Sequence, residues 1–334
     1  MSRGEMLWGT AGLVALVAVG TPSAAQEKGS ALLREGRYEE ALAAFDTQLR
    51  GPGSADAAHG KAMTLRTLGR YAEAIAFVEE RIKVQPTGLR TVLGELYADT
   101  GRYDEARRWL EEALSAGDLD RLRARLRLGE LALASGEGER AQEHFDGLLD
   151  AYNAGHAQSA DDLIAVGDAC RRLGAEDSGL FRDALRAYDE ATAADRGSIA
   201  SRVALAELFL DKYNGTEARG EVQAALAINA SDPAALLALA RVENFEGRFT
   251  AMDRARKSLE INPAFVPARV FVAQLLLELE DFEGAVEEAE IAIETHPRSL
   301  DALSILAAAR YLQGDDAGFS ALEAQIAALN PRYA

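Results

Sequence analysis

The sequence predicts an all-α protein, a solenoid of about nine antiparallel helix-turn-helix repeats. Three observations predict this fold class. Pro263, Pro297 and Pro331 fall 34 residues apart each time, Gly-x-aromatic segments recur at a similar period, and the apolar residues on either side of them follow helical spacing. A fixed period of this length indicates one supersecondary unit that is repeated and stacked, and such arrays usually bind other molecules and seldom catalyse reactions.

The first 25 residues differ from the rest of the chain. Arg3 is followed by an apolar run over residues 7–20, and small residues precede Gln26. A run of about 14 residues is too short to span a bilayer, which needs about 20. It predicts a cleavable secretory signal over residues 1–25, with cleavage after Ala25, and an irregular capping helix is the alternative. We therefore expect an exported protein, periplasmic or secreted, with no membrane insertion after cleavage.

Each repeat is marked by the turn between its two helices. The turn residues and their followers are Gly36-Arg37-Tyr38, Gly69-Arg70-Tyr71, Gly101-Arg102-Tyr103, Gly136-Glu137-Gly138, Gly247-Arg248-Phe249, Glu280-Asp281-Phe282 and Gly314-Asp315-Asp316. Two further units are marked by Val166-Gly167 and Leu205-Ala206. The glycine allows a tight turn, small residues such as Gly94 and Ala106 let the two helices approach closely, and the proline that follows the second helix ends it.

This pattern resembles the tetratricopeptide repeat, and the resemblance covers nearly all of the chain after residue 25. It implies a right-handed superhelix in which the first helices of the repeats line a concave groove. The tryptophan that this family carries in the first helix is absent, since Ala58, Arg90 and Arg202 stand in its place.

The array is divided in the middle by two longer connections. They lie near residues 152–160 and 175–179, so we expect an N-terminal sub-array over residues 26–150 and a C-terminal one over residues 151–334. Such insertions are found at functional edges of solenoids and as tolerated surface changes, and both interpretations stay open here.

Composition narrows the choice of partners. The formal net charge is −18, which repels phosphate backbones, so we expect neither nucleic acid nor an anionic membrane as a partner. The single cysteine, Cys170, cannot form an internal disulfide and stands at a position that is apolar in other repeats, which favours a packing role.

No enzyme motif is recognisable. The four histidines are scattered without metal-ligand spacing, and the chain contains neither a His-Glu-x-x-His nor a Gly-x-Ser-x-Gly segment. The paired glutamates, such as Glu79-Glu80, recur on the solvent side of the second helices. We expect a non-catalytic protein with no cofactor and no metal site.

The resemblance places candidate partner-binding residues on the first helices. They are Glu95, Asp99, Glu130, Asp168, Arg171, Glu207, Asp211, Arg241, Asn244, Phe245, Gln274 and Tyr311. These residues predict a groove that is acidic in the middle and apolar toward the C-terminus, suited to a protein or peptide with basic and apolar side chains. The alternative is that the charges only solvate the inner face. The lysine and asparagine residues with which chaperone-tail binders of this family hold acidic C-termini are absent.

The C-terminal segment Asn330-Pro331-Arg332-Tyr333-Ala334 resembles the start of a tenth repeat. We therefore expect self-association through an uncapped C-terminal end as one property of the chain. The function that the sequence supports is an interaction scaffold in the bacterial periplasm or cell envelope. The alternative, from a weaker resemblance at residues 180–189 and 210–214, is the repeat region of a larger exported zinc peptidase whose catalytic domain lies outside this chain.

Overall fold

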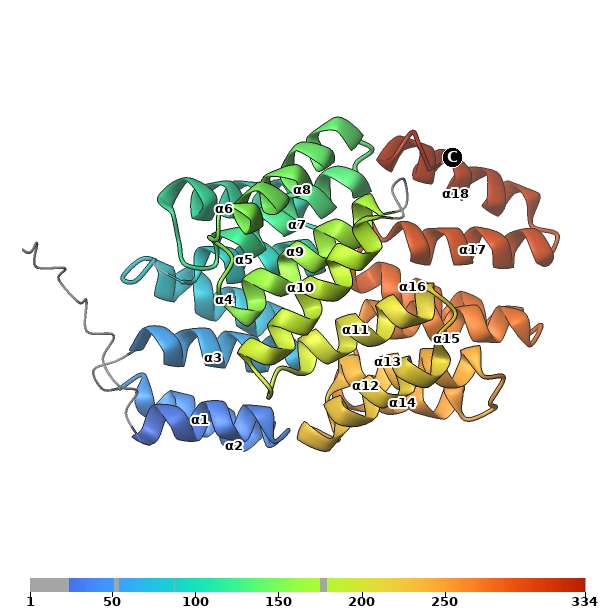
Figure 1. Ribbon diagram of the computed structural model, residues 1–334. Helices are drawn as coiled ribbons and strands as arrows, with labels where there is room; N and C mark the ends of the chain where they lie inside the picture. Colours follow the sequence, from blue (N-terminus) through green and yellow to red (C-terminus); the bar gives the residue numbers. More distant parts are fainter. Residues whose placement is uncertain (1–23, 51–53, 87, 175–178, 334) are drawn as a thin grey trace, which may run out of the picture.

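Eighteen α-helices form nine antiparallel hairpins in the computed structural model, which describes residues 24–50, 54–86, 88–174 and 179–333 (Figure 1). No strand occurs within those ranges, so the predicted fold class is confirmed. The first-half helices are α1 Ala24–Arg34, α2 Tyr38–Gln48, α3 Ser54–Thr67, α4 Tyr71–Ile82, α5 Arg90–Asp99, α6 Tyr103–Ala116, α7 Arg121–Ala134, α8 Gly138–Asn153 and α9 Ala160–Leu173. The others are α10 Leu180–Ala194, α11 Ile199–Asp211, α12 Gly215–Ile228, α13 Pro233–Phe245, α14 Ala251–Ile261, α15 Val266–Glu278, α16 Phe282–Thr295, α17 Leu300–Leu312 and α18 Asp316–Leu329.

Glycine shapes each hairpin in the two ways that the sequence predicts. The turn glycines, for example Gly101 with φ +73°, adopt the left-handed conformation that other residues enter at a cost. Glycines within first helices permit close approach instead: a Cβ on Gly94 would lie 2.6 Å from Cγ of Leu110. In two hairpins Tyr213 and Glu280 take the left-handed turn position at φ 57° and 60°.

The periodic prolines lie where the sequence predicts them, directly after second helices. Helices α14, α16 and α18 end one residue before Asn262, His296 and Asn330, and Pro263, Pro297 and Pro331 follow. Cys170 is buried in the core that α9 shares with its neighbours, and burial raises the pKa of its thiol to about 11. This environment suits packing rather than nucleophilic chemistry.

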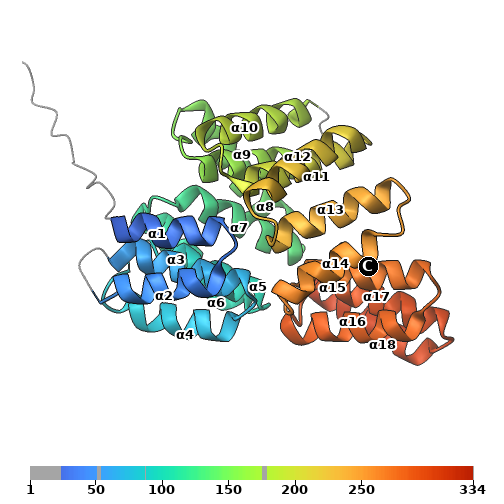
Figure 2. The ribbon, with the colours of Figure 1, turned by 90° about the horizontal axis from the view of Figure 1, so that it is seen from below.

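The superhelix turns back on itself, so that hairpins far apart in sequence become neighbours. Figure 2 shows helices α1–α6 and α14–α18 as two blocks facing each other beneath α9–α12. The turns inside the first four hairpins contact the loops that follow α12, α14, α16 and α18. We call this line of contacts the seam, made by Gly36, Gly69, Gly101 and Gly136 on one side and by Asn229, Asn262, His296 and Asn330 on the other.

Two of the three seam asparagines, Asn262 and Asn330, make the same double contact, while Asn229 donates to the Tyr38 hydroxyl at 3.0 Å instead. The Asn262 side chain accepts the Ala264 amide at 3.0 Å and donates to the Arg66 carbonyl at 3.4 Å. Asn330 accepts the Arg332 amide and donates to the Leu133 carbonyl, both at 3.0 Å. Each asparagine thus closes its own loop and holds the facing turn.

Several predictions fall partly outside the described residues. The signal segment does so over residues 1–23, as does the longer connection over residues 175–178. The connection near residues 152–160 is shorter than expected, because α8 continues to Asn153. The division into sub-arrays at residue 150 stays a prediction. Among the described helices, none combines the length and the apolar character that crossing a membrane requires.

Candidate binding surface

The inner face of the superhelix carries a chain of arginine–carboxylate ion pairs. It begins on α3, where the Arg66 guanidinium lies 3.0 Å from the Glu95 carboxylate and 2.6 Å from that of Asp99. Arg123 on α7 makes two bonds to Glu95, at 2.8 and 2.6 Å. Since Glu95 is 3% exposed, these bonds satisfy a carboxylate that would otherwise be costly to bury.

The chain of pairs continues through α7 to α9. Arg127 lies 2.6 Å from Asp99 and 2.8 Å from Glu130. Arg172 on α9 also reaches Glu130, at 2.9 Å. Consecutive first helices are therefore connected by charge as well as by apolar packing.

A second group of pairs joins α9, α11 and α13. Arg171 lies 2.8 Å from Glu207 and 2.6 Å from Asp211, and Arg241 also pairs with Glu207. Seven of the twelve sequence-predicted residues therefore belong to ion pairs of the inner face. They are Glu95, Asp99, Glu130, Arg171, Glu207, Asp211 and Arg241.

These pairs correct the expectation of an acidic groove. Five of the six predicted carboxylates have at least one arginine partner, and Asp168 is the exception. Arg66, Arg123 and Arg127, which stand on the same face, were not among the predicted residues. Burial alone would raise the pKa of Glu95, but Arg123 and Arg66 outweigh it and hold that pKa below its usual range. The middle of the inner face is therefore balanced in charge.

Asp168 differs from the other carboxylates. The Tyr188 hydroxyl donates to it at 2.5 Å, and no arginine lies within ion-pair distance among the described residues. Burial raises the pKa of Asp168 to about 6. Asp168 is thus a half-buried acid with a raised pKa, which keeps its proton to a higher pH than an exposed aspartate does.

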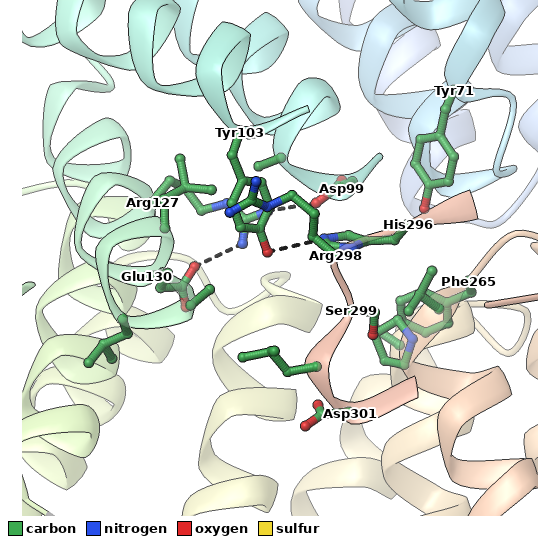
Figure 3. Close-up of a pocket in the computed structure, with 18 of the residues that line it drawn as sticks. Tyr71, Asp99, Tyr103, Arg127, Glu130, Phe265, His296, Arg298, Ser299 and Asp301 are labelled. Atoms are coloured by element: carbon green, nitrogen blue, oxygen red, sulfur yellow. Dashed lines mark hydrogen bonds and ion pairs between the residues drawn. The ribbon is translucent and has the colours of Figure 1, made fainter. Parts of the chain in front are cut away.

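A cavity of about 960 Å³ lies where the two halves of the superhelix meet. One wall comes from the C-terminal parts of α3, α5 and α7, and the opposite wall from the loops and first turns that begin α13, α15 and α17. Figure 3 shows Tyr71, Tyr103 and Phe265 around this space, with Arg127 bonded to Asp99 and Glu130 at one side. The volume is at the upper end of the range for ligand pockets.

The seam residue His296 and its neighbour Arg298 both line this cavity. The His296 ring stands edge-on to Tyr103, with centroids 5.5 Å apart, and its Nδ1 is buried without a partner among the described residues. Burial lowers the pKa of His296, so the ring is neutral at neutral pH. Arg298 also contacts Tyr103: its guanidinium carbon lies over the ring, 4.6 Å from the ring centre.

The remaining predicted residues are divided between two places. Arg241 and Gln274 line a smaller cavity of about 340 Å³, which shares Asp301 and Tyr333 with the large one and therefore adjoins it. Asn244, Phe245 and Tyr311 lie at or near the free turns of the last hairpins instead. Phe245 is 44% exposed and Tyr311 is 61% exposed.

Sequence reasoning missed most residues of the cavity. Tyr71, Tyr103, His296 and Arg298 belong to the periodic turn and proline segments, which predicted only helix ends. The turn glycines and the proline-containing loops recur at nearly the same period. This common period is the signal that could have found these residues, because it allows successive turns to pair with successive loops. No group of three metal-ligating side chains occurs in the described part of the chain.

Two family models match the sequence. One describes the tetratricopeptide repeat and matches residues 91–156 and 273–334. The other describes subunit 3 of the anaphase-promoting complex, or cyclosome, and matches residues 34–113. Both support the family resemblance, and neither describes a peptidase. No curated protein sequence matches the chain.

Solved structures agree on the fold. A chain of the Cut9–Hcn1 hetero-tetramer of the anaphase-promoting complex matches with a TM-score of 0.61 at 15% identity, over 92% of this chain and 60% of the other. The chain thus spans less than two thirds of that relative. Human IFIT1, as a dimer with PPP-AAAA, matches with a TM-score of 0.50 at 16% identity, over 92% of this chain and 72% of the other. At these identities the likeness shows the fold alone.

Proposed function

Because the chain is built of tetratricopeptide repeats, we propose that it is a non-catalytic scaffold that binds a segment of a partner protein on its inner face. The cavity between the two halves is the observation that carries this proposal. It is lined by side chains from at least six helices and by four seam loops, and it adjoins a second cavity along the same face. An extended segment of a few residues fits such a volume.

The aromatic lining supports the same proposal. Tyr71, Tyr103, Phe265 and Tyr333 offer rigid side chains that combine an apolar ring with, in the tyrosines, a hydroxyl. Residues of this kind are enriched where proteins hold partners, because they contribute large contact area at a low entropic cost.

The cellular place of this scaffold is a proposal from the sequence. The apolar run over residues 7–20 and the small residues before Gln26 support export to the bacterial periplasm or the medium. Fusion of residues 1–30 to a phosphatase that is active only outside the cytoplasm tests it. We expect the fusion to be active, and to lose its activity when Leu13 and Val14 are replaced by arginine. An inactive fusion contradicts export.

A photo-crosslinking amino acid placed at Met63, which lines the cavity, tests partner binding directly. We expect a cross-link to a defined segment of one partner, mapped by mass spectrometry and suppressed by a synthetic peptide of that segment. The same amino acid at Arg256, which is exposed on α14, is the control. Equal products at both positions, or none at Met63, contradict binding in the cavity.

A further inference from the structure

The cavity differs in charge from the rest of the protein. The whole chain has a formal net charge of −18, yet the cavity is lined by five arginines and four carboxylates. The arginines are Arg66, Arg127, Arg172, Arg298 and Arg332, and the carboxylates are Asp99, Glu130, Asp232 and Asp301. Acidic residues outnumber basic ones in the whole chain, whereas arginines outnumber carboxylates in the cavity lining.

The pairing inside the cavity leaves two of those arginines available. Arg66, Arg127 and Arg172 are bound to carboxylates of the inner face. Arg298 and Arg332 have no carboxylate within ion-pair distance in the described part of the chain. Nε of Arg298 is buried without a hydrogen-bond partner, whereas its guanidinium plane lies on Tyr103. A buried donor without a partner is costly, and a ligand that accepts from it removes the cost.

The acids of the same wall do not compete for these arginines. Asp232 caps α13 by accepting the Ala235 amide at 2.9 Å, and the Tyr333 hydroxyl donates to Asp301 at 3.3 Å. The helices α13, α15 and α17 also begin at this wall, so the positive ends of their peptide dipoles are directed toward the cavity. Among the described residues, no carboxylate of this wall lies within ion-pair distance of Arg298 or Arg332.

We propose that this cavity recognises an acidic peptide segment, whose carboxylates bind Arg298 and Arg332 while neighbouring parts of the segment pack on Tyr103 and Phe265. Guanidinium groups bind carboxylates in a bidentate manner, and arginine stacked on an aromatic ring is already oriented for that contact. The inference rests on the proposed scaffold function and names the chemistry of its partner. It replaces the basic partner expected from the sequence.

A peptide is favoured over a polynucleotide by the charge of the surroundings. A segment with two or three carboxylates can enter the cavity as a short ligand, and its charge is screened from the remaining surface at physiological salt. A nucleic acid strand carries a phosphate at every residue, and those phosphates would meet the acidic exterior on leaving the cavity.

The test measures peptide binding to the purified protein by isothermal titration calorimetry at about 50 and 300 mM salt. The probe is a capped peptide of about eight residues containing glutamate, glycine and one tyrosine. Its counterparts carry glutamine or lysine in place of glutamate, and inorganic phosphate and a short single-stranded RNA are further probes. We expect the acidic peptide alone to bind, more weakly at the higher salt.

Variants connect that binding to the two arginines. R298Q and R332Q should each weaken the acidic peptide about tenfold, while R298K should retain part of the affinity because it keeps the positive charge. R256Q removes an arginine on the outer side of α14 and should change nothing. Since R332Q alters an exposed side chain, it separates a loss of ligand contact from a loss of folding, which circular dichroism also checks.

Other outcomes overturn the inference. Equal affinity for the glutamate and glutamine peptides, tighter binding of the lysine peptide or the RNA, or phosphate binding as tight as the peptide would each do so. If cross-linking at Met63 nevertheless identifies a partner segment in the cavity, the scaffold function stands and only its acidic specificity fails.

Discussion

Among the four seam residues that follow second helices, His296 is the one that is not an asparagine. Asn262 and Asn330 each bond an amide of their own loop and a carbonyl of the facing turn. The imidazole at position 296 instead contacts the Tyr103 ring edge-on and lies 3.4 Å from the Tyr103 hydroxyl through Nε2, whereas its Nδ1 has no partner among the described residues. Compared with Asn262 and Asn330, His296 therefore makes one fewer hydrogen bond and places an aromatic ring in the cavity wall.

The H296N variant should therefore be more stable than the wild type. The new amide is expected to donate to the Ala98 carbonyl, which occupies the place of Arg66 and Leu133 in the other turns, and to accept the Arg298 amide. These two bonds replace the long hydrogen bond of 3.4 Å between Nε2 of His296 and the Tyr103 hydroxyl, so the net gain in the free energy of unfolding is about 1 kcal/mol. Denaturant titration at pH 7 measures the change, with H296A as the control that cannot make either bond. A gain shared by H296A, or no gain, contradicts the double contact.

Asp168 gives the protein a defined pH dependence. Its pKa is raised by burial from 3.8 to about 6, so between these values the folded state holds the proton more tightly than the unfolded state. The free energy of unfolding therefore falls as the pH rises through this window, by up to about 3 kcal/mol for the shift.

The D168N variant should lose this dependence. Its side-chain oxygen can still accept the Tyr188 hydroxyl, so the variant should be more stable than the wild type at pH 8 and similar to it at pH 3.5. Denaturant titrations at both pH values measure the difference. A constant difference between the two proteins across the pH range would show that Asp168 does not titrate in this way.

At the scale of one helix hairpin, stability depends on where glycine stands. A Cβ on Gly129 of α7 would lie 2.5 Å from Cε1 of the buried Phe145, whereas a Cβ on Gly220 of α12 would meet nothing within 4 Å. Replacing glycine by alanine favours a helix by about 1 kcal/mol.

The same substitution should therefore have opposite effects at the two sites. G220A should raise the free energy of unfolding by about 0.5 to 1 kcal/mol, and G129A should lower it by about 1 to 3 kcal/mol, because α7 and α8 must separate. Thermal unfolding followed by circular dichroism compares the two variants directly. Stabilisation by both would mean that Phe145 yields without cost, and would contradict the close approach of the helices.

Helix hairpins are the level at which sequence analysis succeeded. Turn glycines, small residues at close approaches and prolines after second helices are local signals, and local geometry decides what they do. The partners of Glu95 and Asp99 were not found, because the arginines that neutralise them lie on adjacent first helices about 30 positions away. Deciding that Arg66 and Arg123 face the same carboxylate requires the packing angle between hairpins, which no single repeat contains.

At the scale of the whole molecule, the seam makes hairpins that are distant in sequence depend on one another. Linear repeat arrays are stabilised by neighbours alone and can unfold in parts. Here the loops after α14 and α18 hold the turns of the second and fourth hairpins. Loosening the seam should therefore expand the molecule without unfolding the hairpins.

The N262A/N330A double variant tests this dependence. It removes two bonds across the seam and two within its loops, and should lower the free energy of unfolding by about 2 to 4 kcal/mol. Small-angle X-ray scattering should show a larger radius of gyration, and hydrogen exchange should rise in both halves. N153A/N244A, which changes two asparagines away from the seam, is the control. An unchanged radius with uniform loss of stability would contradict a role in closure.

The seam pairs each turn with a loop 193 to 195 residues further along the chain, from Gly36 with Asn229 to Gly136 with Asn330. Repeat proteins commonly diversify by gaining or losing whole units. In this chain a unit inserted between the fourth and sixth hairpins would move every loop past its turn and misalign all four contacts at once. We therefore expect added or lost repeats to be tolerated at the two ends of the array, and the stretch enclosed by the seam to keep its length.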